Sequence, residues 1–193
     1  SNTALTDLHC YSNQVASLDL SPNTDLTSLR CHGNELTALD VSAALTNLEC
    51  SSNQLTSLDV SSNTALTTLN CNSNQLTSLD VSANTALTWL NCGDNQLIHL
   101  NMKNGVTDAL TTFDATVNSF DCIEVNADDI AYATANWTYA NDNIDDGVTF
   151  DVICGAAART NWHVATTGSD AAGSGTLASP LANIQTAINA TTD

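Results

Sequence analysis

Four aspartates recur at one position of a repeated pattern, and their carboxylates are of a type that binds metal ions. Serines flank them on both sides, as in residues 57–61. Carboxylates about 5 Å apart repel each other by roughly 0.8 kcal/mol in bulk water, so some interaction should offset the repulsion. We expect each to accept hydrogen bonds from Ser, Thr or backbone groups of a tight turn. The first alternative is calcium held between neighbouring carboxylates, because this ion prefers hard oxygen ligands. The second is a repetitive Ser, Thr and Asp surface of the ice-binding kind. The four residues are Asp19, Asp40, Asp59 and Asp80.

Five cysteines also recur, and thiolates at suitable spacing would bind zinc. No C-x-x-C pair occurs, and the steps between the five are 21, 19, 21 and 21 residues, which is a structural period. We therefore predict free, buried thiols that act as small hydrophobic side chains. These cysteines are Cys10, Cys31, Cys50, Cys71 and Cys92.

Catalytic motifs are absent from the sequence. His9 and His32 occur near Asp7 and Glu49 in the repeated pattern, but strand geometry separates their Cα atoms by about 8 Å. No nucleophile elbow, H-E-x-x-H or phosphate loop is present. We predict a chain that is not an enzyme and has no cofactor, with calcium as the one possible ion.

A period of about 21 residues determines which elements position these side chains. One coil is two residues shorter between Val41 and Leu45, where other coils carry an extra pair such as Asn63 and Thr64. Inward Leu and Cys side chains of one coil cannot bury themselves alone, so a core forms only when coils stack at about 4.8 Å. The leucines that mark the period are Leu5, Leu26, Leu45, Leu66 and Leu87.

Each coil has the pattern L-x-x-L-x-C-x-x-N-x-L-x-x-L-D-V-S, as in residues 66–82. This pattern resembles the leucine-rich repeat, with Cys in place of the third Leu, over roughly residues 1–125. It is similar to the short repeats of internalin-like and Bacteroidetes surface proteins. The resemblance implies a mainly β solenoid of about five to six coils, with a strand on one side and a second extended or turn segment on the other. It also implies an inward ladder of asparagines that satisfies backbone groups at the turn after each strand. These are Asn13, Asn34, Asn53, Asn74 and Asn95.

The outward positions on the Cys-bearing strand vary from coil to coil against a monotonous background. Leucine-rich repeats generally bind partners through this strand face, so the resemblance implies a surface for a protein or polysaccharide ligand. A merely solvated face is the alternative. The candidate ligand-binding residues are His9, Tyr11, Arg30, His32, Glu49 and Trp89.

Residues 121–154 depart from the repeat and are expected to cover the last coil as a C-terminal cap, similar to the closing module of secreted Bacteroidetes leucine-rich repeat proteins. We predict a short helix with Asp128 as its N-cap. Its apolar face would contain Ile130, Ala133 and Trp137.

Cys122 and Cys154 fall outside the cysteine ladder and flank the expected cap. We predict a disulfide between them in an oxidising, extracellular setting, with two free thiols as the alternative. The acidic run 141–147 is similar to a calcium loop, but Ile144 occupies a position that the pattern reserves for Asp or Asn, and no Glu follows at the twelfth position. We predict a solvated turn there.

Residues 155–193 form the third expected region, after repeats at 1–120 and the cap at 121–154. They resemble the opening strand, loop and helix of right-handed parallel β-helix proteins, a family rich in polysaccharide lyases. Ser179 and Pro180 suit the N-cap and first turn of that helix. We expect this region to be less ordered than the repeats unless another surface covers its apolar stripe, Leu181, Ile184 and Ile188.

The 193 residues carry a net charge of −18. This excludes nucleic acid and anionic membranes as expected partners, because basic patches bind both. No run of about 18 apolar residues and no basic and apolar leader occur, so we expect neither membrane insertion nor a signal peptide. The expected function is a non-catalytic extracellular or cell-surface module for recognition or adhesion, or a spacer, within a larger secreted protein. The alternative is an accessory domain of a β-helix polysaccharide-degrading enzyme whose active site lies outside these residues.

Overall fold

The computed structural model describes residues 2–155 of the chain. The chain divides into two compact units, residues 1–154 and residues 155–193. The fold of the first unit is given below. The helix and apolar stripe expected near the C-terminus lie outside the described residues and stay predictions: Ser179, Pro180, Leu181, Ile184 and Ile188.

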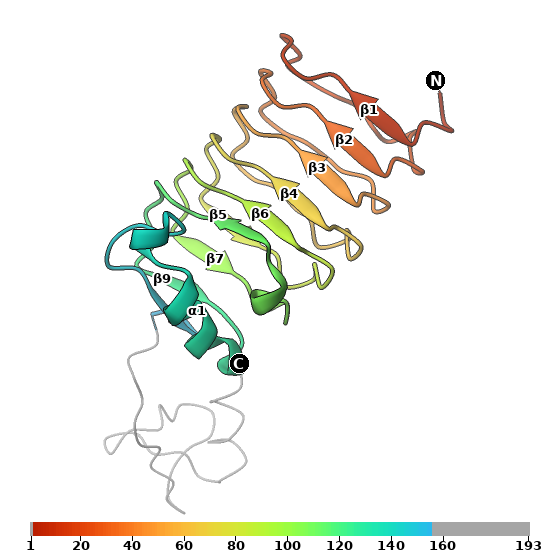
Figure 1. Cartoon of the computed structure of the whole chain (residues 1–193). Coiled ribbons are helices and arrows are strands. Elements are labelled where there is room, and N and C mark those ends of the chain that lie inside the picture. Colours follow the sequence, from red (N-terminus) through yellow and green to blue (C-terminus); the bar gives the residue numbers. More distant parts are fainter. Residues whose placement is uncertain (1, 156–193) are drawn as a thin grey trace, which may run out of the picture. The chain divides into compact units, whose positions relative to one another are not determined.

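Six short parallel strands form the first sheet, one strand from each successive coil (Figure 1). The register places buried residue beside buried residue, so Leu8 pairs with Leu29 and Leu90 pairs with Phe113. Each strand therefore points the same side chains inward and the same side chains outward. In order across the sheet the strands are β1 (Asp7–His9), β2 (Ser28–Arg30), β3 (Asn47–Glu49), β4 (Thr68–Asn70), β6 (Trp89–Asn91) and β8 (Thr112–Asp114).

A second parallel sheet forms on the other side of the later coils only. Its four strands are ordered β10-β9-β7-β5. In the first three coils the equivalent residues form no strand, so the predicted second segment becomes a strand only from the fourth coil onward. The strands are β5 (Ser78–Asp80), β7 (His99–Asn101), β9 (Cys122–Glu124) and β10 (Thr149–Asp151).

Helix is scarce in the described residues. There is one α-helix of seven residues, α1 (Ile130–Asn136). Three single-turn 3₁₀ helices accompany it: η1 (Thr107–Ala109), η2 (Ala127–Asp129) and η3 (Tyr139–Asn141). The predicted mainly β solenoid of five to six coils is confirmed.

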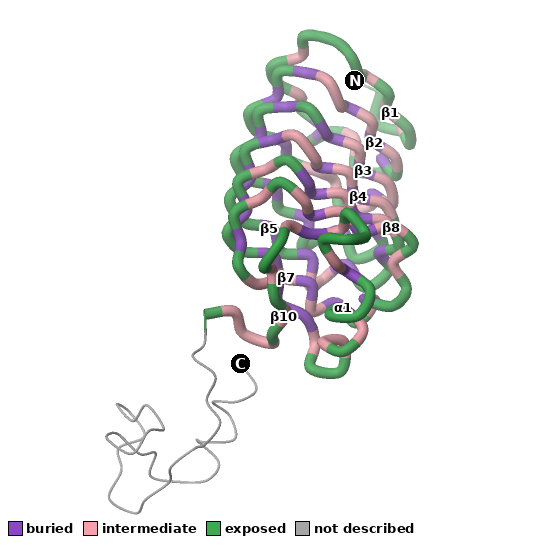
Figure 2. The backbone as a smooth tube through the Cα atoms, turned by 60° about the vertical axis from the view of Figure 1, so that its left-hand side comes forward, coloured by how far each residue is buried: buried purple, intermediate pink, exposed green. Residues whose placement is uncertain are grey.

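The core is a stack of leucines with a column of cysteines beside it. Figure 2 shows buried positions recurring at the same place in successive coils. Fully burying each such leucine contributes roughly 1.5–3 kcal/mol relative to leaving it exposed. In the first coil, where one neighbouring coil covers the equivalent side chains, they are only partly buried: Leu5, Leu8, Cys10, Val15 and Leu18. The middle coils bury them fully, with 0% exposure for Leu45, Leu48, Cys50 and Leu55.

The predicted asparagine ladder is present at the turn after each strand. Asn53 shows the pattern: its Oδ1 accepts a hydrogen bond from the Leu36 N–H at 3.0 Å, and its Nδ2 donates to the carbonyls of Cys31 and Cys50 at 3.1 Å. One side chain thus satisfies backbone groups of two coils, which is the structural role expected for it. The ladder also runs one coil further than predicted, because Asn118 makes the same bonds to Leu97 and Cys92.

A column of threonines joins the coils just before each strand. The hydroxyl of each donates to the backbone carbonyl of the threonine in the preceding coil, as from Thr67 to Thr46 at 2.9 Å. Each coil thereby gains a hydrogen bond to its neighbour beyond the strand ladder. The donors are Thr27, Thr46, Thr67, Thr88 and Thr111.

The C-terminal segment, residues 121–154, packs aromatic side chains on the last coil. Trp137 is 4% exposed and stacks on Phe113, with ring centroids 4.0 Å apart. The predicted N-cap is wrong: Asp128 lies inside η2, and Asp129 occupies the N-cap position of α1. The Asp129 side chain does not cap the helix either, because it accepts a hydrogen bond from the Thr107 hydroxyl at 2.9 Å.

The acidic run 141–147 is more than the solvated turn that the sequence predicts. The Asn143 carbonyl accepts from the Ala115 N–H at 2.8 Å, and its Nδ2 donates to the Phe113 carbonyl at 2.8 Å. The Asp145 carboxylate accepts from the N–H groups of Val117 and Asn118 at 2.9 Å. This run therefore satisfies backbone groups along the edge of β8, where no further strand pairs. The sequence alone could not show the contact, because the run has no repeat register.

A disulfide joins Cys122 and Cys154, as predicted, and the five ladder cysteines are free thiols. Beside the disulfide, the Glu124 side chain is 11% exposed and forms ion pairs with Lys103 at 3.1 Å and His99 at 3.4 Å. Its Oε1 also accepts from the Cys154 N–H at 3.2 Å. The disulfide and the hydrogen bond to Glu124 thus hold Cys154 against β9.

Among the described residues, no helix combines the length and the apolar character needed to cross a membrane.

Candidate ligand-binding face

The outward side chains of the first sheet form three rows across the coils, which we call the strand face. Alternation along each strand directs these side chains away from the core. The first row, one residue before the buried strand residue, holds Asp7, Ser28, Asn47, Thr68, Trp89 and Thr112. The second row, one residue after it, holds His9, Arg30, Glu49, Asn70, Asn91 and Asp114. The third row, two residues further along, holds Tyr11, His32, Ser51, Asn72, Gly93 and Thr116.

Aromatic rings gather at the β1 and β2 end of this face. The rings of Tyr11 and His32 are parallel, with an interplanar angle of 4° and centroids 4.7 Å apart. His9 lies against Tyr11 at 6.2 Å with a tilt of 46°. Tyr11 remains 47% exposed, so the stack presents an aromatic surface to solvent. We call Tyr11, His32, Arg30, Glu49 and His9 the aromatic cluster.

The Glu49 carboxylate on the neighbouring strand lies close to two side chains of the cluster, Arg30 and His32. Its Oε1 lies 3.2 Å from Arg30 Nε, and its Oε2 lies 3.8 Å from His32 Nδ1. Both nitrogens are buried, and neither has a hydrogen-bond partner of good geometry among the described residues. A buried donor without a partner costs on the order of 1–3 kcal/mol. A ligand could reach only the exposed parts of the two side chains, 42% of Arg30 and 32% of His32, and not these buried nitrogens.

A contact with Asp7 orients the remaining histidine. His9 Nε2 lies 2.8 Å from Asp7 Oδ1 on the same strand, and both side chains are about half exposed. An exposed pair of this kind contributes at most about 1 kcal/mol to stability. Its effect is therefore to orient the His9 ring.

The structure brings five of the six sequence-predicted residues together and leaves one apart. His9, Tyr11, Arg30, His32 and Glu49 lie on three adjacent strands, β1 to β3. Trp89 lies in the first row of β6, and β4 separates that strand from β3. At about 4.8 Å per strand, the offset between Trp89 and Glu49 along the solenoid is roughly 10 Å. The sequence pattern predicted the shared face but could not show this separation.

Between the two aromatic sites the strand face is polar and carries no aliphatic side chain. Amides and hydroxyls occupy it; Ser51 is buried, and the others are partly exposed. These residues were not singled out from the sequence, although their outward register was visible there. They are Asn47, Ser51, Thr68, Asn70, Asn72 and Asn91.

The aspartate column lies on another side of the coils and bonds to its own turns. The carboxylates of Asp19, Asp59 and Asp80 each accept from the N–H of the serine two residues later, at 2.8–3.0 Å. Hydrogen bonds from the Ser21 side chain and backbone hold the pKa of Asp19 below its usual value, and Ser61 does the same for Asp59. Burial alone would raise the pKa of Asp80, but hydrogen bonds from Ser82 and Asn101 and the nearby His99 lower it overall.

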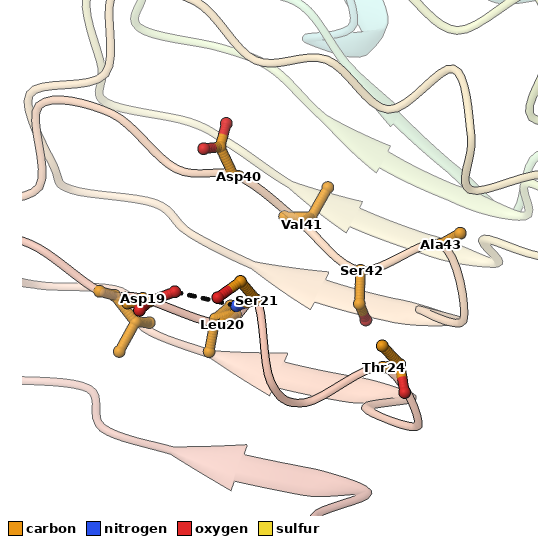
Figure 3. A pocket seen from close by; sticks show the side chains of 9 residues that line it. Asp19, Leu20, Ser21, Thr24, Asp40, Val41, Ser42 and Ala43 are labelled. Atoms are coloured by element: carbon orange, nitrogen blue, oxygen red, sulfur yellow. Dashed lines mark hydrogen bonds between the residues drawn. The ribbon is translucent and has the colours of Figure 1, made fainter. Parts of the chain in front are cut away.

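Asp40 differs because its coil has the shortened turn. No hydrogen bond from Ser42 to its carboxylate is found among the described residues, and Ser42 instead donates its hydroxyl to the Leu26 carbonyl at 3.1 Å. A shallow groove of about 430 Å³ opens between this coil and the first, with Asp19 and Asp40 on its two sides (Figure 3). No group of three or more His, Cys, Asp or Glu side chains in the described part of the chain is arranged to hold one metal ion.

The hydrogen bonds of the described residues include none from a serine, threonine or cysteine side chain to a histidine. The strand face offers noncovalent contacts: stacking on aromatic rings and hydrogen bonding to amides, hydroxyls and the Arg30 and Glu49 pair.

The fold of this chain is similar to that of solved structures, whereas its sequence matches no family. No protein-family model matches the chain, and no curated protein matches it. Among solved structures, the functional domain of InlJ from Listeria monocytogenes, described as including a cysteine ladder, is 26% identical over 78% of this chain and 45% of that chain. The TM-score is 0.33. This chain thus spans less than half of the length of that structure.

Proposed function

We propose that residues 1–154 form a non-catalytic extracellular recognition module that binds its ligand through the strand face. The aromatic cluster carries this proposal. A half-exposed Tyr11 stacked on His32, with Arg30 oriented by Glu49 beside it, combines residue types that dominate binding energy at interfaces. Mere solvation does not require a preformed aromatic stack on an exposed surface.

The disulfide supports an extracellular location. Such bonds persist in oxidising compartments and are rare in the cytosol. We further propose that the segment 121–154 acts as the C-terminal cap of the solenoid, because it buries Phe113 and bonds to the edge of β8.

An array of extracellular proteins and glycans, probed with the fluorescently labelled 193-residue chain, tests this function. We expect binding to be lost in the double variant Tyr11→Ala/Arg30→Ala. The matched control is Asp19→Asn/Asp59→Asn, which changes two exposed residues of the aspartate column and should bind as the unaltered chain does. Binding that survives the first variant and is lost in the second would place the site on the aspartate column and not on the strand face. No binding to any arrayed ligand would favour a spacer instead.

A further inference from the structure

We propose that the ligand of the strand face is a linear, uncharged polysaccharide that crosses the coils between the aromatic cluster and Trp89. This inference rests on the proposed function and adds the chemical class of the ligand. It follows from the polar surface between the two aromatic sites, the donors and acceptors of the cluster, and the charge of the molecule.

The surface between the aromatic sites lacks what a protein partner would use. The buried centre of a protein interface is enriched in apolar and aromatic side chains. Here the outward positions of β3 and β4 hold amides, hydroxyls and one carboxylate. A polyhydroxylated ligand matches that surface, because every hydroxyl both donates and accepts hydrogen bonds.

The aromatic sites supply the apolar contacts that such a ligand needs. A sugar ring has a C–H face and a rim of hydroxyls, so it packs on an aromatic ring while its rim reaches neighbouring polar groups. Tyr and Trp combine an apolar body with a polar tip, which suits that contact. Tyr11 is half exposed on one side of the face, and Trp89 lies in the first row of β6, where it is partly exposed.

The Arg30 and Glu49 pair suits neighbouring hydroxyls better than an anion. The pair offers N–H donors and carboxylate acceptors within 3.2 Å of each other, and Arg30 is 42% exposed. An uncharged ligand can use both partners without breaking the pair. An anionic ligand would compete with Glu49 and would meet the repulsion of a chain with a net charge of −18.

The spacing of the aromatic sites requires an extended ligand. From Tyr11, just after β1, to Trp89 on β6 there are four strand steps, roughly 19 Å along the solenoid. The two residues also lie in different rows, so a ligand that contacts both crosses the sheet obliquely. A chain of several sugar rings spans this distance, whereas a single sugar does not.

Calorimetric titration of the 193-residue chain with defined oligosaccharides tests the inference. The probes are linear hexasaccharides of β-1,4-glucose, β-1,4-xylose, β-1,4-mannose and α-1,4-glucose, with oligogalacturonate as the anionic comparator. We expect at least one neutral hexasaccharide to bind and its disaccharide to bind at least tenfold more weakly. Tyr11→Ala and Trp89→Ala should each weaken hexasaccharide binding at least tenfold.

Two controls keep the result interpretable. Tyr139→Ala removes an aromatic ring that is 64% exposed and lies off the strand face, and it should leave the affinity unchanged. Trp89→Phe keeps an aromatic ring and should retain most of the affinity, which separates stacking from loss of folding. An unchanged melting temperature for each variant confirms that the solenoid is intact.

Three outcomes would overturn the inference: no binding of any neutral hexasaccharide at millimolar concentration, preference for the anionic comparator, or binding that both alanine variants retain. If the labelled chain still binds an arrayed protein in a manner that depends on Tyr11 and Arg30, the inference falls and the proposed function stands. If neither experiment finds binding, both fall.

Discussion

The five ladder thiols have different accessibility although they share one position in the repeat. Burial raises the pKa of Cys31 to about 12 and raises those of Cys50, Cys71 and Cys92 well above the usual range. Cys10 also has a raised pKa but is only partly buried. Because the thiolate is the reactive form, the inner thiols should be inert in the folded chain.

A thiol reagent at pH 8 should therefore label Cys10 first in the native protein. Unfolding without reduction should release the other four ladder thiols, for five in total, because Cys122 and Cys154 are bonded to each other. Mass spectrometry of the labelled peptides counts and locates them. Seven reactive thiols in the unreduced, denatured chain would show that the disulfide does not form.

The Val117 backbone is in the left-handed region, with φ of 57°. It occupies the position just before the ladder asparagine, where other coils have Ser, Gly or Asp. Left-handed backbone costs an ordinary L-residue roughly 1–2 kcal/mol, and a β-branched residue is a strong outlier there. The side chain is 62% exposed, so replacing it loses little burial. Val117→Asn should therefore raise the free energy of unfolding by about 0.5–1 kcal/mol, as measured by urea denaturation.

Ser52→Asn, at the same position of an inner coil with φ of 52°, is the matched control and should change stability less. Equal effects of the two substitutions, or destabilisation by Val117→Asn, would show that no strain is relieved.

Among the elements, β9 depends on a charge network as well as on its disulfide. Closing a loop between residues 32 apart in sequence stabilises the folded state by roughly 3–4 kcal/mol in the chain-entropy model. Burial by itself would raise the pKa of Glu124, but hydrogen bonds from Lys103 and the Cys154 N–H, with the charges of Lys103 and His99, hold it below its usual value.

A depressed carboxyl pKa stabilises the fold above the pKa of the unfolded chain, about 4.3 for Glu, and this contribution disappears as the pH falls through the lower folded pKa. Glu124→Gln should therefore destabilise the protein by roughly 1–3 kcal/mol at pH 7. The difference from the unaltered chain should shrink below pH 4. Urea denaturation from pH 7 to pH 3 measures this. Exposed Glu35→Gln is the control, and a difference independent of pH would contradict the charge network.

Three of the four aspartates of the column bond to their own turns without an ion. Asp19, Asp59 and Asp80 each bond to a backbone N–H, so calcium would have to replace interactions already made. We expect 5 mM calcium to leave the melting temperature unchanged. Calcium bridging predicts the opposite, because an ion that binds only the folded state raises the melting temperature. A rise that Asp59→Asn abolishes would establish the bridging.

The whole solenoid should lose structure from its first coil. The amides of Cys10 and Cys50 make the same bond to the next coil, at 2.9 and 2.8 Å. Stability in such arrays is a sum of contacts between neighbouring coils, and in this chain the first coil is packed on one side only. Hydrogen exchange of the 193-residue chain should therefore be at least about 100-fold slower at Cys50 than at Cys10. Equal protection of the two amides would mean that all coils open together.

The net charge of −18 acts on the whole molecule as well. It keeps chains apart and repels anionic polymers, and salt should screen both effects. Within this field, Arg30 is the only Lys or Arg on the strand face of the described coils. Its pair with Glu49 has no net charge, which suits an uncharged ligand.

Residue types and spacing alone determined the stack of coils, its buried Leu and Cys columns and the asparagine ladder. In a solenoid each coil contacts only its neighbours, so a covalent period of about 21 residues becomes a spatial column directly. The inward or outward direction of Asp19, Trp89 or Asn53 follows from that register. For the same reason the sequence predicted which residues share the strand face, although not how their side chains are arranged.

Only the tertiary structure decided which side chains meet. The Tyr11 and His32 stack, the approach of Glu49 to Arg30, and the distance of Trp89 depend on rotamers and strand order, which a repeat pattern does not encode. Contacts between segments that are not related by the repeat could not be predicted from the sequence either. The Asn143 and Asp145 groups that bond the edge of β8 lie about 30 residues beyond it, and no register relates the two segments. Periodic sequence predicts contacts between equivalent positions, whereas contacts between unlike segments depend on how the whole chain packs.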